Sequence, residues 1–86
     1  MSQIIVIEIL TKQNCTLCDE AKKVVTKVLP DYPARLVMTD IESDPLLHKE
    51  FKERIPLVRI NGKESFVYKT HETTLRRKLD RFKGGG

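Results

Sequence analysis

The 86-residue chain has no tryptophan, only five phenylalanine and tyrosine residues, four glycines and two cysteines. Its core must therefore be built mainly from isoleucine, valine and leucine. Two cysteines are too few for the several disulfides that hold small secreted proteins together. The longest apolar run, Ile4–Ile7, ends at Glu8 and is far too short to span a bilayer. We therefore expect neither a disulfide-rich miniprotein nor a membrane protein, and the length excludes a two-domain enzyme.

The first residues carry neither a basic stretch nor a small-residue cleavage site, so we expect a cytoplasmic protein. Thiols stay reduced in the cytosol, and a cysteine pair there needs a chemical explanation. We expect a single domain over residues 1–83. The glycines at 84–86 are expected to form a flexible tail.

The net charge of +4 is unevenly distributed along the chain. Residues 1–68 hold ten lysine and arginine residues against ten aspartate and glutamate residues, whereas residues 69–83 hold six against two. Neither a groove-reading motif nor aromatic residues interleaved with the basic ones accompany this excess, so we expect no nucleic-acid binding. The excess indicates the solvated face of the last helix, and docking of an acidic protein partner stays open as an alternative.

The apolar pattern predicts four strands and three helices. The strands are expected at Gln3–Leu10, Arg35–Ile41, Leu57–Ile60 and Glu64–Lys69, and the helices at Cys15–Leu29, Pro45–Glu53 and His71–Phe82. Asn61-Gly62 predicts a two-residue hairpin turn. In the last helix we expect Thr70 as the cap and Leu75, Leu79 and Phe82 facing inward.

The resulting order is β-α-β-α-β-β-α, which places the chain in the α/β class. The first strand, helix and second strand imply a parallel crossover, and the hairpin adds an antiparallel strand. We therefore expect a four-stranded mixed sheet with helices on both faces.

The main chemical signal is Cys15-Thr16-Leu17-Cys18, where the first strand leads into the first helix. The unpaired N–H groups and partial positive charge of a helix N-terminus stabilise a thiolate over a thiol. Cys15 is the expected nucleophile. Cys18, one turn later, can attack a mixed disulfide formed at Cys15, and Lys12 can add positive charge. The spacing thus predicts a redox-active dithiol.

These residues resemble the thioredoxin superfamily, and most closely the small glutaredoxin-like proteins. The segment from Lys12 to Cys18 is similar to the glutaredoxin Lys-x-x-Cys-Pro-Tyr-Cys segment, and Lys22 matches a further lysine. Ile55-Pro56 is similar to the Val-Pro segment of the family, whose proline is cis. The resemblance covers residues 3–82. It implies a thioredoxin fold in which Pro56 lies beside Cys15 and the backbone of Ile55 pairs with an extended thiol substrate.

The sequence also departs from the glutaredoxin pattern. Thr16-Leu17 replaces the Pro-Tyr pair, and Lys69-Thr70-His71-Glu72 stands where glutaredoxins carry the Gly-Gly-x-Asp segment that holds glutathione. The backbone at Thr70 offers a weaker carboxylate site at a helix N-terminus. The resemblance therefore supports dithiol chemistry more strongly than it supports one particular substrate.

The resemblance implies a thiol–disulfide oxidoreductase that reduces protein or glutathione mixed disulfides. The expected catalytic residues are Cys15 and Cys18, and the expected substrate-binding residues are Lys12, Leu17, Ile55, Pro56 and Thr70. We expect a monomer with no tightly bound cofactor. Glutathione is a candidate reductant or substrate, and a thiol reductase system is the expected partner.

Two alternatives stay open. A zinc site would need His48 and His71 to join the cysteines, but these histidines lack zinc-finger spacing, so no metal site is expected. The other alternative is a module that docks partners without turnover or binds an iron–sulfur cluster through Cys15 in a dimer.

Overall fold

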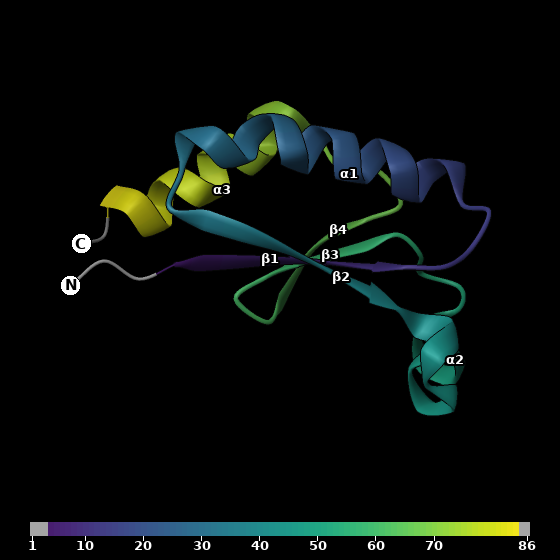
Figure 1. Ribbon diagram of the computed structural model, residues 1–86. Helices are drawn as coiled ribbons and strands as arrows, with labels where there is room; N and C mark the ends of the chain where they lie inside the picture. The colour runs from purple at the N-terminus through teal and green to yellow at the C-terminus, as the bar shows by residue number, and fades with distance from the viewer. Residues whose placement is uncertain (1–3, 85–86) are drawn as a thin grey trace.

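The computed structural model describes residues 4–84, which form one four-stranded sheet and three α-helices (Figure 1). The strands are β1 (Ile5–Thr11), β2 (Ala34–Asp40), β3 (Leu57–Ile60) and β4 (Lys63–Val67). The helices are α1 (Thr16–Val28), α2 (Pro45–Phe51) and α3 (Glu72–Gly84), and short 3-10 turns follow α1 at Leu29–Asp31 and β2 at Ile41–Ser43. The expected order of elements is confirmed. The prediction of a tail from residue 84 was wrong at its first residue, because α3 continues to Gly84. Residue 3, at the start of the first predicted strand, and residues 85–86 of the predicted tail lie outside the described residues.

The sheet has the strand order β2-β1-β3-β4. β1 runs parallel to β2, and β3 is antiparallel to both β1 and β4. On one face of the central strand β1, Ile5, Ile7 and Ile9 are buried in the cluster under α1 and α3, whereas on the other face Val6 and Glu8 are only partly buried. Leu10, at the end of the strand near α2, is fully buried as well.

Helices lie on both faces of the sheet, as expected, but cover them unequally. Figure 1 shows α1 and α3 side by side above one face and α2 below the other, near the end where β1 leads toward α1. Asp44 caps α2 by accepting a hydrogen bond from the Leu46 N–H at 2.9 Å, and Pro45 takes the first helical position, which suits proline.

The sheet and the helices that cover it enclose two apolar clusters. The larger lies between the sheet and the helices α1 and α3, and its buried members include Ile7, Val25, Val58, Leu75 and Leu79. The smaller cluster lies at the α2 end of the sheet, and its buried members are Leu10, Cys18, Ile41, Phe51, Ile55 and Leu57. The second cysteine is therefore part of the core of the fold.

The predicted hairpin at Asn61-Gly62 is confirmed. Asn61 has φ 50° and Gly62 has φ 86°, the pair of positive angles that a tight two-residue hairpin requires. The Asn61 side-chain oxygen also accepts a hydrogen bond from the Val6 N–H at 2.9 Å, and the Asn61 N–H donates to the Val6 carbonyl at 2.8 Å. The turn is thus fastened to the central strand.

Two expectations about α3 were wrong. Phe82 is 45% exposed, because Leu75 and Leu79 are the α3 residues that reach the buried cluster and Phe82 lies one turn beyond them. Thr70 does not cap the helix. The carbonyl of His71 accepts the N–H of Leu75 at 2.9 Å, so the helix begins one residue later than predicted, and the Thr70 hydroxyl has no hydrogen-bond partner among the described residues.

Charged and hydroxyl groups join the C-terminal end of α1, and the turn that follows it, to α3. We call this group the distal clasp; it consists of Lys27, Asp31, Tyr32, Glu72, Arg76 and Asp80. Arg76 pairs with Asp31 at 2.8 Å and with Glu72 at 3.1 Å, and Lys27 pairs with Glu72 at 3.1 Å. The Tyr32 hydroxyl donates to the Asp80 carboxylate at 2.8 Å.

The contacts of the distal clasp shift the pKa values of its members. The hydrogen bond to Asp80 raises the pKa of Tyr32, because the neighbouring carboxylate disfavours the phenolate. Hydrogen bonds from Lys27 and Arg76 lower the pKa of Glu72, and those to Asp31 and Glu72 raise the pKa of Arg76. Each shift favours the protonation state found at neutral pH.

Of the helices described in residues 4–84, none has the length and apolar character needed to cross a membrane.

Candidate active site

Cys15 and Cys18 form a disulfide at the N-terminus of α1, with their Cα atoms 5.2 Å apart. Cys15 is the N-cap residue of the helix, and its Sγ accepts a hydrogen bond from the Cys18 N–H at 3.1 Å. Asn14, with φ 56°, turns the chain from the loop after β1 into the helix. Asparagine tolerates this left-handed conformation better than most residues do. The pairing of the two cysteines is as the spacing predicted.

The two sulfur atoms differ in access. Cys18 is 2% exposed and belongs to the smaller apolar cluster, whereas Cys15 is only partly buried and packs against the edge of that cluster. An external thiol or disulfide therefore reaches Cys15 far more readily than Cys18. This asymmetry suits a first cysteine that meets the substrate and a second that acts from inside.

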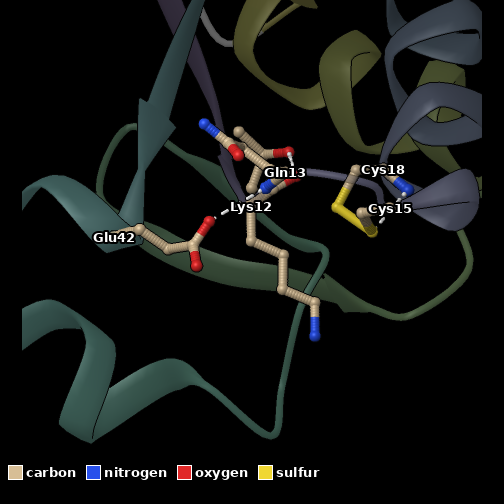
Figure 2. The surroundings of a disulfide bond; sticks show 6 residues. Lys12, Gln13, Cys15, Cys18 and Glu42 are labelled. Atoms are coloured by element: carbon tan, nitrogen blue, oxygen red, sulfur yellow. Dashed lines mark hydrogen bonds between the residues drawn. A yellow bond between two sulfur atoms is a disulfide. The ribbon is translucent and has the colours of Figure 1, made fainter.

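One positive group lies at the Cys15 sulfur: the N–H of Cys18, one of the helix N-terminal donors that lack an intrahelical partner. The ammonium of Lys12 was expected to be a second. Figure 2 shows the exposed Lys12 side chain extending away from the disulfide, and no ion pair among residues 4–84 involves it. The helix terminus is therefore the positive group that the structure places at Cys15.

A glutamate from another part of the chain holds the loop before Cys15. The Glu42 carboxylate, on the 3-10 turn between β2 and α2, accepts a hydrogen bond from the Gln13 N–H at 3.1 Å (Figure 2). The Glu42 N–H in turn donates to the side chain of Asp40 at 2.8 Å. Sequence reasoning missed this contact, because no local motif links residues 29 positions apart.

The Ile55–Pro56 peptide bond is cis, as the resemblance implied. Both residues are buried, and Ile55 shares the smaller apolar cluster with Cys18 and the edge residue Cys15. The carbonyl of Pro56 accepts the N–H of Tyr68 at 2.8 Å, which joins the segment before β3 to the end of β4. The fold thus brings a segment 40 residues further along the chain to the dithiol.

Leu17 and Thr70 line a cavity of about 500 Å³ between α1 and the loop from β4 to α3. Leu17 is 37% exposed, and the hydroxyl oxygen of Thr70 is buried without a hydrogen-bond partner among the described residues. Tyr68 forms part of the wall, and its hydroxyl donates to the carbonyl of Glu53. The other lining residues are Glu20, Ala21, Lys23, Val24, Lys69 and His71.

The two histidines lie in different places. His71 lines the cavity beside Thr70, whereas His48 is exposed on α2. Within residues 4–84, no group of three or more His, Cys, Asp or Glu side chains has the arrangement needed to hold a metal ion.

The strand order, the helices on both faces and the dithiol at the start of α1 define a thioredoxin fold. Solved structures support this assignment. Northeast Structural Genomics target protein XcR50 from X. campestris is similar, with a TM-score of 0.72, 23% identity and coverage of 86% of this chain and 95% of that one. Mitochondrial thioredoxin 3 from Saccharomyces cerevisiae, in its oxidized form, has a TM-score of 0.66, 19% identity and coverage of 92% and 79%.

Within this fold the family is also defined. Residues 6–80 match the family model described as Glutaredoxin-like domain (DUF836). The chain therefore belongs to this glutaredoxin-like family.

Proposed function

We propose that the protein is a thiol–disulfide oxidoreductase in which Cys15 is the nucleophile and Cys18 the resolving cysteine. The observation that carries the proposal is the asymmetry of the pair: Cys15 is accessible and accepts a helix N-terminal N–H, whereas Cys18 is buried one turn behind it. Membership of the glutaredoxin-like family and the oxidised pair support a redox function.

In the reduced protein, the Cys15 thiolate attacks one sulfur of a substrate disulfide. The new bond joins Cys15 to the substrate, and the other substrate sulfur leaves as a thiolate that takes up a proton. Cys18 then loses its proton and attacks the Cys15 sulfur, which releases the second substrate thiol. The substrate gains two electrons and two protons, and the protein is left with the Cys15–Cys18 disulfide. An external thiol or a reductase restores the dithiol by attack on the accessible Cys15.

The hydrogen bond that Cys15 accepts has a further role in this proposal. A thiolate at a helix N-terminus is stabilised by the N–H donors and the partial positive charge there. We expect the pKa of Cys15 in the reduced protein to lie below that of an ordinary cysteine. A larger share of Cys15 would then be ionised at neutral pH and ready to attack a substrate disulfide.

We further propose that an extended substrate lies across Ile55 and Pro56, with its backbone beside that of Ile55. Leu17 and Thr70, which line one cavity with Tyr68, would contact the residues that flank the substrate sulfur. The substrate is a protein disulfide or a glutathione mixed disulfide. We propose finally that the protein is a cytoplasmic monomer without a bound cofactor. Glutathione or a reductase would recycle it.

The direct test is the reduction of a disulfide substrate by the wild type and two serine variants. Cys15→Ser should reduce activity to background, because the nucleophile is lost. Cys18→Ser should accumulate a mixed disulfide at Cys15, seen as added substrate mass under non-reducing conditions. Thr26→Ala, on the exposed side of α1, serves as the matched control. Equal activity in Cys15→Ser and the wild type would overturn the proposal.

Parallel assays with glutathione and with thioredoxin reductase identify the recycling system. No turnover in either system would favour a module that docks partners without chemistry. Anaerobic reconstitution that yields a coloured, dimeric protein dependent on Cys15 would instead favour iron–sulfur binding.

A further inference from the structure

A second surface feature lies away from the disulfide, where the edge of the sheet meets α3. A hollow of about 250 Å³ runs between β4 and the C-terminal half of α3, and we call it the β4–α3 groove. Its lining residues are Ile60, Lys63, Glu64, Ser65, Lys78, Arg81 and Phe82. Figure 1 shows the C-terminal end of α3 and the loop that leads into α1 at opposite ends of the molecule.

The β4–α3 groove carries an excess of positive charge. Lys63, Lys78 and Arg81 line it, and none of them forms an ion pair within residues 4–84. The one carboxylate of the groove, on Glu64, is paired with Arg54 at 2.9 Å. Of the six basic residues in 69–83, Lys78 and Arg81 line this groove.

The acidic residues of α3 cannot offset this charge, because they are engaged elsewhere. Glu72 pairs with Lys27 and Arg76, and Asp80 accepts the hydrogen bond of Tyr32. All of these contacts belong to the distal clasp. On the side of α3 that faces the groove, Lys78 and Arg81 have no carboxylate partner within residues 4–84, and the Lys78 ammonium lies 5.6 Å from the centre of the Phe66 ring.

The β4–α3 groove also offers an apolar contact. Phe82 is 45% exposed, and it lines the groove together with buried Ile60. An aromatic ring on a charged surface is a suitable anchor for one apolar side chain of a partner.

The backbone of β4 completes the set of contacts. β4 is an edge strand that pairs only with β3 among the described residues, so its outer N–H and C=O groups are available to a further strand. Lys63 lies on this edge, and a lysine on an edge strand disfavours pairing with the same strand of a second copy. An acidic strand at the same edge would instead be attracted by the Lys63 ammonium.

The acidic segment 40–44 of the chain itself is a poor occupant. Asp40 and Asp44 already accept backbone hydrogen bonds, from Glu42 and Leu46, in a tightly turned segment. A second copy would have to break these caps to offer an extended acidic strand.

We propose that the β4–α3 groove binds an extended acidic segment of a partner protein. The segment adds a strand to β4, its carboxylates face Lys63, Lys78 and Arg81, and one apolar side chain packs on Phe82. This docking goes beyond the proposed redox chemistry and leaves Cys15 accessible.

The probe is a fluorescein-labelled nonapeptide in which glutamate at the odd positions alternates with valine and a phenylalanine replaces the central glutamate, so that the carboxylates and the ring lie on one face of the strand. Binding is measured by fluorescence anisotropy, and it should weaken as salt is added. The same peptide with lysine in place of glutamate should not bind. Amide shifts in NMR spectra should map to β4 and to the second half of α3.

The variants separate this site from general attraction to a basic protein. Lys78→Glu with Arg81→Glu should weaken binding roughly tenfold or more, since two favourable charge contacts become repulsive. Lys49→Glu with Lys52→Glu changes the net charge equally on α2 and should leave the affinity within about twofold. Lys78→Gln with Arg81→Gln removes the two charges without reversing them, so the loss of affinity should be intermediate. This variant replaces the Lys78→Glu, Arg81→Glu variant if that one does not fold. Phe82→Ala should weaken binding without changing its salt dependence.

Several outcomes would overturn the proposal. One is an equal loss in the α2 control pair. Another is unchanged binding of a peptide N-methylated along one edge, which excludes strand pairing. Tighter binding of a single-stranded oligonucleotide that displaces the peptide would identify a nucleic-acid surface. Self-association in sedimentation that depends on Lys78 and Arg81 would identify a second copy as the occupant.

Discussion

At the disulfide, the loop before α1 and the first turn of that helix are held by a hydrogen bond and apolar packing, whereas at the far end of α1 the distal clasp adds ion pairs to the apolar cluster between α1 and α3. None of the ion pairs among residues 4–84 involves residues 12–18. The loop before the helix is tied instead by the hydrogen bond from Gln13 to Glu42, and buried Cys18 anchors the first turn.

This difference separates stability from chemistry. A substrate reaches a thiolate more easily when few side chains surround it. Further charged groups close to the thiolate would also change its pKa. The distal clasp lies far from the thiol, so it can fix α1 against α3 without affecting the reaction. Changes at the two ends should therefore have different consequences, and the largest is expected beneath the disulfide.

Phe51 supports the disulfide end from below. It is 4% exposed and packs in the same cluster as Leu10, Cys18 and Ile55. Phe51→Ala should lower the free energy of unfolding by about 3–5 kcal/mol and also slow disulfide reduction, because the cavity loosens Cys18 and Ile55. Leu46→Ala, on the same helix but 77% exposed, should change stability by less than about 0.5 kcal/mol. Urea denaturation measures the free energy of unfolding of both variants. A wild-type rate of disulfide reduction in a destabilised Phe51→Ala variant would show that the packing beneath the disulfide does not affect the reaction.

Arg76 is the centre of the distal clasp. Arg76→Gln removes its pairs with Asp31 and Glu72, so the midpoint of thermal unfolding should fall, by less than in Phe51→Ala. The rate of disulfide reduction should stay unchanged. High salt should shrink the difference from the wild type, because salt screens these partly exposed pairs. Slower turnover in Arg76→Gln at a temperature where it is folded would contradict the separation of the two ends.

The distal clasp should also make stability depend on pH at both extremes. Because the pKa of Glu72 is lowered from 4.5, its contribution is present above that pH and is lost as the pH falls through the lower, folded-state pKa. Because the pKa of Tyr32 is raised from 10.0, its contribution is present below that pH and is lost as the pH rises through the higher, folded-state pKa. Thermal midpoints measured against pH should show a weaker acid decline in Glu72→Gln and a weaker alkaline decline in Tyr32→Phe. Curves parallel to the wild type would exclude these groups as the cause.

Local patterns predicted most of the fold and the centre of the site. The apolar run of β1, the Asn61-Gly62 turn and the position of Pro45 each depend on neighbouring residues alone, so the sequence reveals them directly. The Cys15–Cys18 spacing and its place before a helix are likewise local. The cis bond at Pro56 came from the family resemblance rather than from the residues themselves.

The parts that could not be predicted depend on contacts between distant segments. Periodicity placed Phe82 on the inner face of α3, but the buried cluster ends at Leu79, and only the packed structure shows where a core stops. Thr70 has the right side chain for a cap, yet the helix begins one residue too late for it. The distal clasp joins residues more than 40 positions apart, such as Asp31 and Arg76, and no spacing rule selects such partners.

Glu42 offers the finest test of the comparison between the two ends, because its carboxylate holds the loop before Cys15 from a distant part of the chain. Glu42→Ala removes the acceptor for the Gln13 N–H, and disulfide reduction should slow roughly two- to tenfold, as expected for one hydrogen bond that positions the loop. Stability should change little, since Glu42 is exposed. Glu42→Gln keeps an oxygen acceptor and should retain most of the rate. Equal losses in both variants, together with a shifted pKa of Cys15 measured by alkylation, would show that the charge of Glu42 matters rather than its hydrogen bond.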